Sequence, residues 1–212
     1  MCIRDRPRAD RRDSLVGAQS IAAIPQGATV GTSAPRRAAQ LRNLRPDCRV
    51  VMFRGNVATR LAKLEAGAAD VTFLAAAGLA RLGQSKAGNP LSEKDWIPAA
   101  GQGAIVLETR SEDATTVAAI SALDDATTRF ELEAERALLS ALGGTCHSPV
   151  AVLCHLHSTN IAMQAALFSP DGSERVDGDI RFVAGDHGPV RDLAAQLLHQ
   201  ASPAIKQHFG QS

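Results

Sequence analysis

The sequence predicts an α/β fold with a largely parallel sheet, followed by a small α+β domain. Between residues 8 and 98, short apolar and β-branched runs alternate with helical patterns, which is typical of α/β domains. From residue 125 onward the order changes to one long helix, three strands and a final helix. A chain of 212 residues with 45% hydrophobic content is long enough for one large or two modest domains.

The first part is predicted to contain three strands, each followed by a helix. We expect strands at residues 28–30, 49–53 and 70–74, and helices at 34–44, 57–66 and 76–82. Val57, Leu61 and Leu64 fall on one face of the second helix by their spacing. Ligands of such sheets bind at the carboxyl ends of the strands, so the turns after the first two strands are candidates for a binding site.

The later elements follow a different pattern. We expect a strand at residues 103–108, helices at 115–123 and 127–142, strands near 150–156, 161–168 and 175–183, and a helix from 189 to about 200. Asp171 and Gly172 are predicted to form the hairpin turn between the last two strands.

Composition excludes several classes of function. A net charge of +1 argues against a general polyanion binder, because broad nucleic-acid affinity depends on many phosphate contacts. With 3% aromatic residues and no tyrosine, the chain is poorly supplied for base stacking. No apolar run approaches the ~20 residues that span a bilayer. The four cysteines form no CxxC pair, which favours a reducing cytoplasm.

Two small-residue turns place arginines at the start of predicted helices. They are GTSAPRR at residues 31–37 and RGNVATR beginning at Arg54. Free N–H groups at a helix start favour anions, and guanidinium groups bind carboxylate or phosphate in a fixed fork. The two turns together indicate a small acidic ligand. Each cluster by itself is also compatible with ordinary exposed arginines.

Cys146 is the candidate for covalent attachment of a ligand. It follows Gly143 and Gly144 and precedes Pro149. These flanking residues stop both helix and strand, so the thiol is predicted to project from a turn. The alternative is a buried thiol that acts as a small hydrophobic residue.

A metal site is the sharpest alternative role for Cys146, because further candidate ligands lie nearby. They are His147, Cys154, His155 and His157. On a strand, Cys154 would point with Val150 and Val152 to one face, while the two strand histidines would point to the other. The spacing also does not match the usual zinc patterns. We therefore predict no metal, Cys154 in the core, and solvated histidines.

Five short segments occur in an order that is hard to obtain by chance. They are VGTS with RR (residues 30–33 and 36–37), RGNV with TRL (54–57 and 59–61), LAAAGL with RLG (74–79 and 81–83), PAAGQGA (98–104) and GTC (144–146). In this order they resemble the porphobilinogen deaminase family, also called hydroxymethylbilane synthases. The resemblance extends from about residue 8 to the C-terminus.

The resemblance implies a transferase of tetrapyrrole (haem or chlorophyll) biosynthesis. It would join four porphobilinogen molecules into hydroxymethylbilane and release ammonia, with a dipyrromethane cofactor bound to the loop cysteine through a thioether. The implied cofactor-binding residues are Cys146, Thr32, Ser33, Arg36 and Arg37. The implied substrate-binding residues are Arg54, Gly55, Asn56, Arg60 and Arg81. The implied partner is the small molecule porphobilinogen, with no nucleic acid and no membrane, and the implied state is a monomer.

The resemblance also implies a domain organisation like that of periplasmic binding proteins. Residues 8–98 would form an α/β substrate-binding domain, residues 99–124 would return to an incomplete first domain, and residues 125–212 would form the C-terminal domain with the cofactor cysteine. Residues 1–7 resemble nothing in the family and are predicted to be a non-native leader. The strand at residues 103–108 is then expected to lack its sheet neighbours.

The family's catalytic carboxylate is an aspartate in a Met-Lys-Asp segment, which this chain does not contain. Lys94 and Asp95 form its only Lys-Asp pair, but they fall in a region that is a loop in the family, so we assign no role to Asp95. We predict that the chain by itself has no catalytic acid–base residue and is inactive.

Two other functions stay open at this point. The α/β part, with arginines at helix starts, is also compatible with a non-enzymatic receptor-like domain that binds anions or carboxylates. Such a domain would not need the Cys146 loop. A thiol- or zinc-dependent hydrolase is the third reading.

Overall fold

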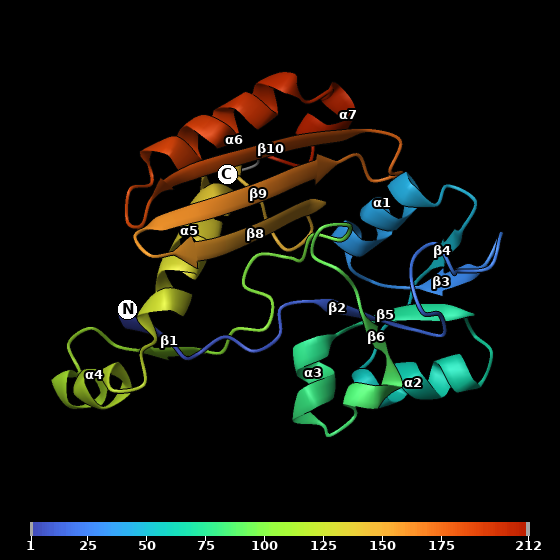
Figure 1. Cartoon of the computed structure of the whole chain (residues 1–212), viewed down its shortest axis with the longest axis horizontal. Coiled ribbons are helices and arrows are strands. Elements are labelled where there is room, and N and C mark those ends of the chain that lie inside the picture. Colours follow the sequence, from blue (N-terminus) through green and yellow to red (C-terminus); the bar gives the residue numbers. More distant parts are fainter. Residues whose placement is uncertain (1, 211–212) are drawn as a thin grey trace.

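The computed structural model describes residues 2–210, which form three sheets covered by helices (Figure 1). The strands are β1 (Cys2–Asp5), β2 (Asp13–Val16), β3 (Thr29–Gly31), β4 (Arg49–Val51), β5 (Val71–Ala75), β6 (Asn89–Pro90), β7 (Val106–Thr109), β8 (Val150–His157), β9 (Asn160–Phe168) and β10 (Arg175–Val183). The helices are α1 (Pro35–Leu44), α2 (Val57–Glu65), α3 (Ala76–Arg81), the 3-10 turn η1 (Ser85–Ala87), α4 (Ala114–Ser121), α5 (Ala126–Leu142), α6 (Gly188–Gln200) and α7 (Pro203–Lys206). None of these helices is long and apolar enough to cross a bilayer.

The five-stranded sheet has the order β4-β3-β5-β2-β6. Strand β3 runs parallel to β4 and β5, whereas β2 runs antiparallel to both β5 and β6. The predicted parallel sheet is therefore present, but two antiparallel strands that the sequence did not predict extend it. Asp13 at the start of β2 lies opposite Ala75 at the end of β5. The start of β2 and the carboxyl ends of the parallel strands thus share one edge.

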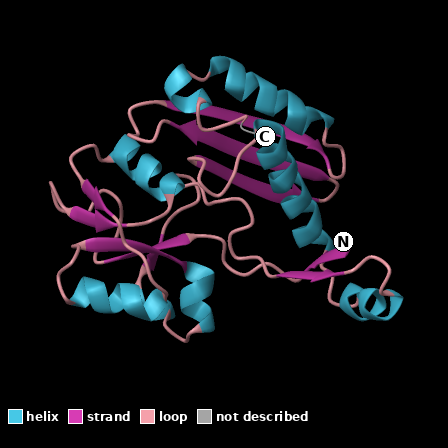
Figure 2. Cartoon of the chain, turned by 180° about the vertical axis from the view of Figure 1, so that it is seen from behind, coloured by secondary structure: helices cyan, strands magenta, loops and turns pink. Residues whose placement is uncertain are grey.

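Helices cover both faces of this sheet (Figure 2). The core on the α1 side contains Leu15, Val30, Leu41, Val71 and Phe73. The core on the α2 and α3 side contains Val16, Leu74 and Leu79, with Val57, Leu61 and Leu64 packed against it. Neighbouring residues of β2 therefore point to opposite faces, as strand geometry requires. The predicted apolar face of α2 is confirmed.

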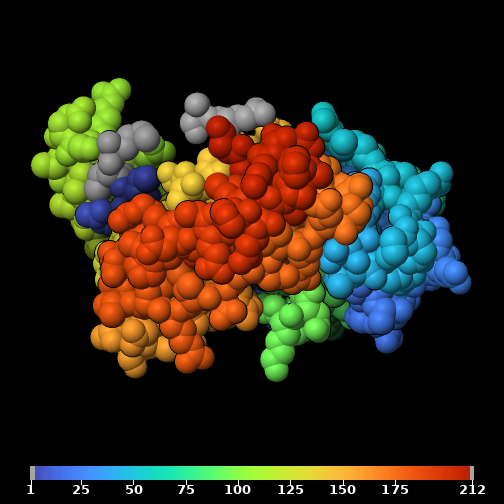
Figure 3. All heavy atoms as spheres, turned by 90° about the horizontal axis from the view of Figure 1, so that it is seen from above, coloured from blue at the N-terminus to red at the C-terminus, as the bar shows by residue number. Residues whose placement is uncertain are grey.

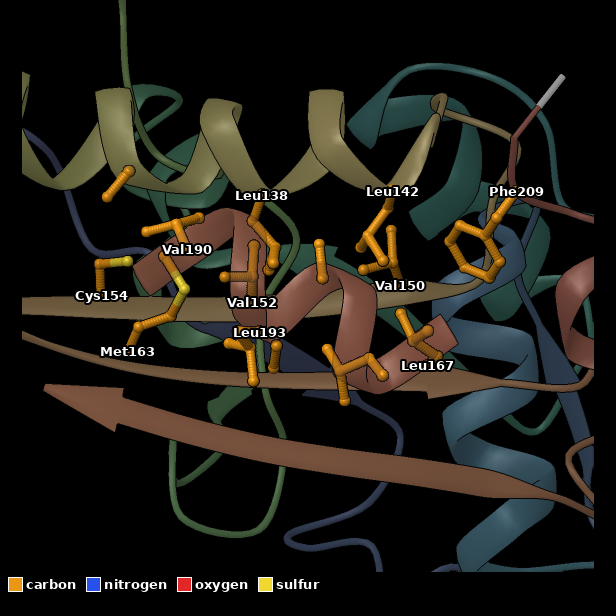
Figure 4. Packing of buried hydrophobic residues seen from close by; sticks show 14 of the residues in the cluster. Leu138, Leu142, Val150, Val152, Cys154, Met163, Leu167, Val190, Leu193 and Phe209 are labelled. Carbon is orange, nitrogen blue, oxygen red and sulfur yellow. The ribbon is translucent and has the colours of Figure 1, made fainter. Parts of the chain in front are cut away.

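The three-stranded antiparallel sheet, in the order β10-β9-β8, has a different core on each face. Leu138 and Leu142 of α5 pack with Val150 and Val152 of β8 on one face, where Figure 4 also shows side chains of α6. The other face packs against Ala39 of α1 and Ile97. The β9–β10 hairpin, orange in the space-filling view, lies beside the light-blue α1 region (Figure 3), where Arg42 donates to the carbonyl of Pro170. Helix α1 thus connects the two sheets.

Strand β7 differs from the expectation for residues 103–108. It begins at Val106, after a turn in which Gly101 and Gly103 have positive φ, and it pairs with β1 along its whole length. The carboxylate of Asp5 in β1 accepts two hydrogen bonds from Arg136 of α5, at 2.9 and 3.1 Å. The expectation that this strand lacks sheet neighbours is therefore wrong. Its second edge has no partner strand among the described residues.

The other predicted helices and strands occur within a few residues of their expected bounds. The hairpin turn is also found, since Gly172 between β9 and β10 has a φ of +75°. The domain boundaries and the non-native leader at residues 1–7 stay predictions, and Met1 lies outside the described residues.

Candidate active site

A cavity of about 380 Å³ lies where the start of α1, the loop at residues 99–102, the end of α5 and the Cys146 loop meet. Its lining includes Arg36, Arg37 and Arg60 together with the thiol-bearing Cys146. Ser33 also contributes to the lining. The volume falls in the range of small-molecule sites. Five of the residues that the sequence singled out therefore share one space.

Cys146 projects from a turn that begins where α5 ends. Gly143 adopts a left-handed conformation with a φ of +61°, and the N–H of Gly144 bonds back to the carbonyl of Leu139 at 2.8 Å. The turn then reverses through Ser148, whose N–H bonds to the carbonyl of Thr145 at 3.0 Å. Cys146 is exposed. The prediction that its thiol projects from a turn is confirmed, and the alternative of a buried thiol is wrong.

Arg36 and Arg37 lie in the first turn of α1, as predicted, but both are buried and bind a carboxylate of the chain itself. Arg37 donates from Nε (3.0 Å) and Nη2 (2.6 Å) to one oxygen of Asp13. Arg36 donates from Nη2 to the other oxygen at 2.7 Å. The reading of these arginines as exposed surface residues is therefore wrong. Much of the fork that the sequence assigns to an acidic ligand is occupied by Asp13.

Asp13 is held from several sides. Trp96 donates from Nε1 to Oδ2 at 2.7 Å, and Gln102 donates from Nε2 to Oδ1 at 2.9 Å. Burial by itself would raise the pKa of Asp13, but the charges of the two arginines and these hydrogen bonds outweigh burial and lower the pKa. The carboxylate therefore stays ionised in the interior, as a counter-charge to both arginines.

One buried donor of this cluster is left over. The Nε–H of Arg36 has no hydrogen-bond partner among residues 2–210, although the atom is buried. An unpaired buried N–H costs free energy. Arg36 also lines the cavity together with Arg37 and Arg60, which makes the lining rich in cations. The residues present therefore fit a ligand or cofactor that carries carboxylates.

Arg60 reaches the same cavity from α2. Asn56 caps this helix by accepting a hydrogen bond from the N–H of Thr59 at 2.9 Å, and Arg60 donates to the carbonyl of Gly55 (2.9 Å) and to Oγ of Ser33 (3.3 Å). Burial and the nearby charge of Arg37 lower the pKa of Arg60. The two anion-binding turns predicted from the sequence thus meet through Arg60 and Ser33.

The remaining predicted site residues do not line the cavity. Thr32 is buried and accepts a hydrogen bond from the N–H of Ala34, and Gly55 and Asn56 shape the start of α2. Arg81 donates to the carbonyl of Gly103. Arg54 is exposed, and its guanidinium has no partner among the described residues.

Sequence reasoning missed the residues that hold the arginines, above all Asp13. Gln102 lies in the PAAGQGA segment, which the sequence did single out, whereas Asp13 lies in a run that reads as polar. A signal exists in the alternation of β2, because Asp13 shares a face with the core residue Leu15. A carboxylate on a core face requires a buried cation, and α1 provides two.

Cys154 and the histidines occupy the positions that strand alternation predicts. Cys154 is buried in the core of the C-terminal domain, and burial, together with nearby Glu135 and Glu131, raises its pKa. His155 lies on the other face, where its Nε2 is 3.1 Å from a carboxylate oxygen of Glu93. Residues 2–210 contain no group of three or more histidine, cysteine or acidic side chains arranged to hold a metal ion.

Comparisons with known proteins agree with this geometry. Residues 3–118 match the family model "Porphobilinogen deaminase, dipyromethane cofactor binding domain", and residues 129–188 match "Porphobilinogen deaminase, C-terminal domain". A porphobilinogen deaminase of Sphingopyxis alaskensis is 49% identical over 208 residues, which are 95% of this chain and 65% of the relative. Those of Paracoccus denitrificans and a Roseiflexus species are 42% and 46% identical, over 93% of this chain and 64% and 66% of the relatives.

The chain thus spans about 65% of the length of the curated relatives it matches. These matches do not favour the receptor-like alternative. The two matching family models, the first of which covers more than half of the chain, show that this chain belongs to the porphobilinogen deaminase family.

Proposed function

We propose that the protein containing this chain joins four porphobilinogen molecules into hydroxymethylbilane with release of ammonia. The observation that carries the proposal is the shared cavity, which is lined by an exposed thiol and three arginines. The family model that matches residues 3–118 is named for binding the dipyrromethane cofactor. A cytoplasmic location and a monomeric state belong to the same proposal.

Cys146 is the residue that would hold the dipyrromethane. Its thiol can displace the amine of a porphobilinogen unit, so that a sulfur–carbon bond forms and the thiol proton leaves with the amine as ammonia. The resulting thioether is uncharged and is not reduced by cellular thiols, so Cys146 is an anchor that does not turn over. When bound, the dipyrromethane supplies the terminal pyrrole ring to which each new unit is joined.

The arginines would bind the acetate and propionate groups of the pyrroles. Arg36, Arg37 and Arg60 line the cavity, whereas no carboxylate does so among the described residues. Asp13 compensates one of the three charges, which leaves the site positive. Nη1 of Arg60 has no protein partner among residues 2–210, so this donor is open to a ligand carboxylate. We assign the acid–base step to no residue of this chain.

The finer fold assignment belongs to this proposal. The mixed sheet with helices on both faces is compatible with a periplasmic-binding-protein-like domain at residues 8–98. Residues 99–124 would then return to a first domain, and residues 125–212 would form the C-terminal domain that carries Cys146.

The test is the intact mass of the full-length protein, purified from cells that make porphobilinogen. We expect an adduct of dipyrromethane mass on Cys146 of the wild-type protein, and the loss of both adduct and turnover in Cys146→Ser. The control variant Cys48→Ala changes a buried cysteine outside the cavity lining and should keep both. Turnover without any covalent adduct would contradict the proposal. Reversible carboxylate binding by a protein whose Cys146 thiol is unmodified would instead indicate the non-enzymatic receptor-like function.

A further inference from the structure

The C-terminal segment of the described chain packs behind the Cys146 loop. After α7, the side chain of Phe209 enters the core of the C-terminal domain, beside Leu142 and Val150 (Figure 4). The N–H of Gly210 donates to the carbonyl of Leu142 at 3.1 Å. The last residue of α5 is therefore tied to the far end of the chain, at the point where the Cys146 loop begins.

Ser148 makes the second connection between these segments. Its Oγ accepts a hydrogen bond from the N–H of Thr145 at 3.0 Å and donates one to the carbonyl of His208 at 2.8 Å. The side chain is buried, and Ser148 itself lines the cavity. Thr145 and Ser148 flank Cys146 on either side. One hydroxyl therefore closes the turn around the thiol and attaches that turn to the C-terminal segment.

We propose that Ser148 is a positioning residue that keeps the thiol of Cys146 turned toward the arginine-lined cavity. This inference rests on the proposed function, in which Cys146 is the attachment point. Without the hydroxyl, the N–H of Thr145 and the carbonyl of His208 lose their shared partner. The turn then keeps the Ser148 to Thr145 backbone bond and the bond from the N–H of His147 to Oγ1 of Thr145, both local to the loop.

The consequence concerns charge as well as geometry. A thiol held at the cavity lies close to the positive side chains of Arg36, Arg37 and Arg60. Positive charge raises the local concentration of an anionic reagent and leaves that of a neutral one unchanged. The ratio of the two reaction rates at Cys146 therefore reports where the thiol points, whatever its ionisation or exposure, because both reagents attack the same thiolate.

The experiment compares alkylation of Cys146 by iodoacetate and by iodoacetamide in the 212-residue chain, made in cells without porphobilinogen so that the thiol is free. Peptide mass spectrometry separates Cys146 from the other cysteines. The variants are Ser148→Ala, Ser148→Thr as rescue, and Ser169→Ala as a matched control that removes a buried hydroxyl from the β9–β10 hairpin, outside the cavity.

We expect the iodoacetate-to-iodoacetamide ratio to fall by about threefold or more in Ser148→Ala, since local charge changes anion encounter rates by tenfold or more in strong cases. The threonine variant and the Ser169→Ala control should keep the wild-type ratio. Protection of the buried Cys48 and Cys154 shows that each variant is folded. If the Ser148→Ala variant is not folded, Ser148→Val is compared with Ser148→Thr, because these two variants have the same shape and differ in the hydroxyl.

An unchanged ratio in the folded alanine or valine variant would overturn the proposal, as would an equal fall in the Ser169→Ala control. Adduct mass in the full-length protein then separates this inference from the function on which it rests. A wild-type protein without adduct contradicts the proposed function, while the alkylation ratio still decides the role of Ser148. If the wild-type protein carries the adduct and a smaller fraction of Ser148→Ala molecules does, both the proposed function and the role of Ser148 are supported.

Discussion

Replacement of Asp13 by asparagine tests how the arginines of the cavity are held. Asp13 is fully buried, and its carboxylate oxygens accept hydrogen bonds from Arg36, Arg37, Trp96 and Gln102. Asparagine keeps the size of the side chain but removes its charge. Two buried guanidinium groups then lose their counter-charge.

The expected loss of stability is large. Removal of one partner from a buried ion pair costs about 3–5 kcal/mol, against a total stability of about 5–15 kcal/mol for a typical domain. We expect the free energy of unfolding to fall by about 3 kcal/mol or more at pH 7. The loss should be smaller when Arg37→Gln is already present, because much of the cost comes from the unpaired cation.

The pH dependence has a defined sign. Because the folded protein lowers the pKa of Asp13 from its ordinary value of 3.8, the carboxylate stabilises the fold fully above that value. This stability is lost as the pH falls below about 4 toward the folded pKa. The difference between wild type and Asp13→Asn should therefore be greatest near neutral pH and shrink below pH ~4.

Urea unfolding followed by fluorescence measures these quantities. Trp96 is the single tryptophan, stacks on Phe73 with ring centroids 4.6 Å apart, and donates to Asp13, so its emission reports on this region. Asp171→Asn in the exposed β9–β10 hairpin is the control and should cost much less. An equal loss in both variants, or full additivity of Asp13→Asn with Arg37→Gln, would refute the reasoning.

Three further predictions follow from the same geometry. Arg37→Lys keeps the charge but loses the planar fork that bonds to Asp13 and to the carbonyl of Phe73, so the free energy of unfolding in urea should fall by about 1–3 kcal/mol and pyrrole chain elongation should slow in the full-length protein. Wild-type values of both quantities would count against a role for the fork. Gly143→Ala should lower the free energy of unfolding more than Gly67→Ala, since both glycines have left-handed backbones but only at Gly143 would an added Cβ meet backbone, at 2.6 Å from the N of Gly210. Equal losses in urea unfolding would show that this close contact does not matter. The 212-residue chain supplied with porphobilinogen should form no hydroxymethylbilane, measured after cyclisation to uroporphyrin, because no carboxylate among residues 2–210 lines the cavity. Turnover like that of a complete relative would instead mean that this chain contains an acid–base residue.

The sequence predicted the elements whose patterns are local. Helices α1, α2 and α5 and strands β8, β9 and β10 occur close to the positions that their local sequence patterns indicate. Strand β2 was missed, because its four residues are all buried yet begin with Asp13 and Ser14. Burial of a carboxylate depends on cations from a helix more than twenty residues away, which no local window contains.

The candidate site shows the same limit. The turn that presents Cys146 could be predicted, since glycine and proline determine it locally. The roles of Arg36 and Arg37 could be predicted only in part, because their type indicates an anion but not which one. The structure provides Asp13 as that anion and leaves the Nε of Arg36 free.

The distribution of charge around the cavity indicates where a ligand carboxylate gains most. Burial lowers the pKa of both Arg36 and Arg60, and the charge of Arg37 lowers each of them further, which means that Arg37 repels both cations. Asp13 offsets this repulsion for Arg36 and Arg37 through direct ion pairs. Arg60 has no ion pair with any residue between 2 and 210 and bonds only to the neutral oxygens of Gly55 and Ser33. A carboxylate bound beside Arg60 would therefore relieve repulsion that the protein itself leaves uncompensated, and binding there should depend most strongly on ionic strength.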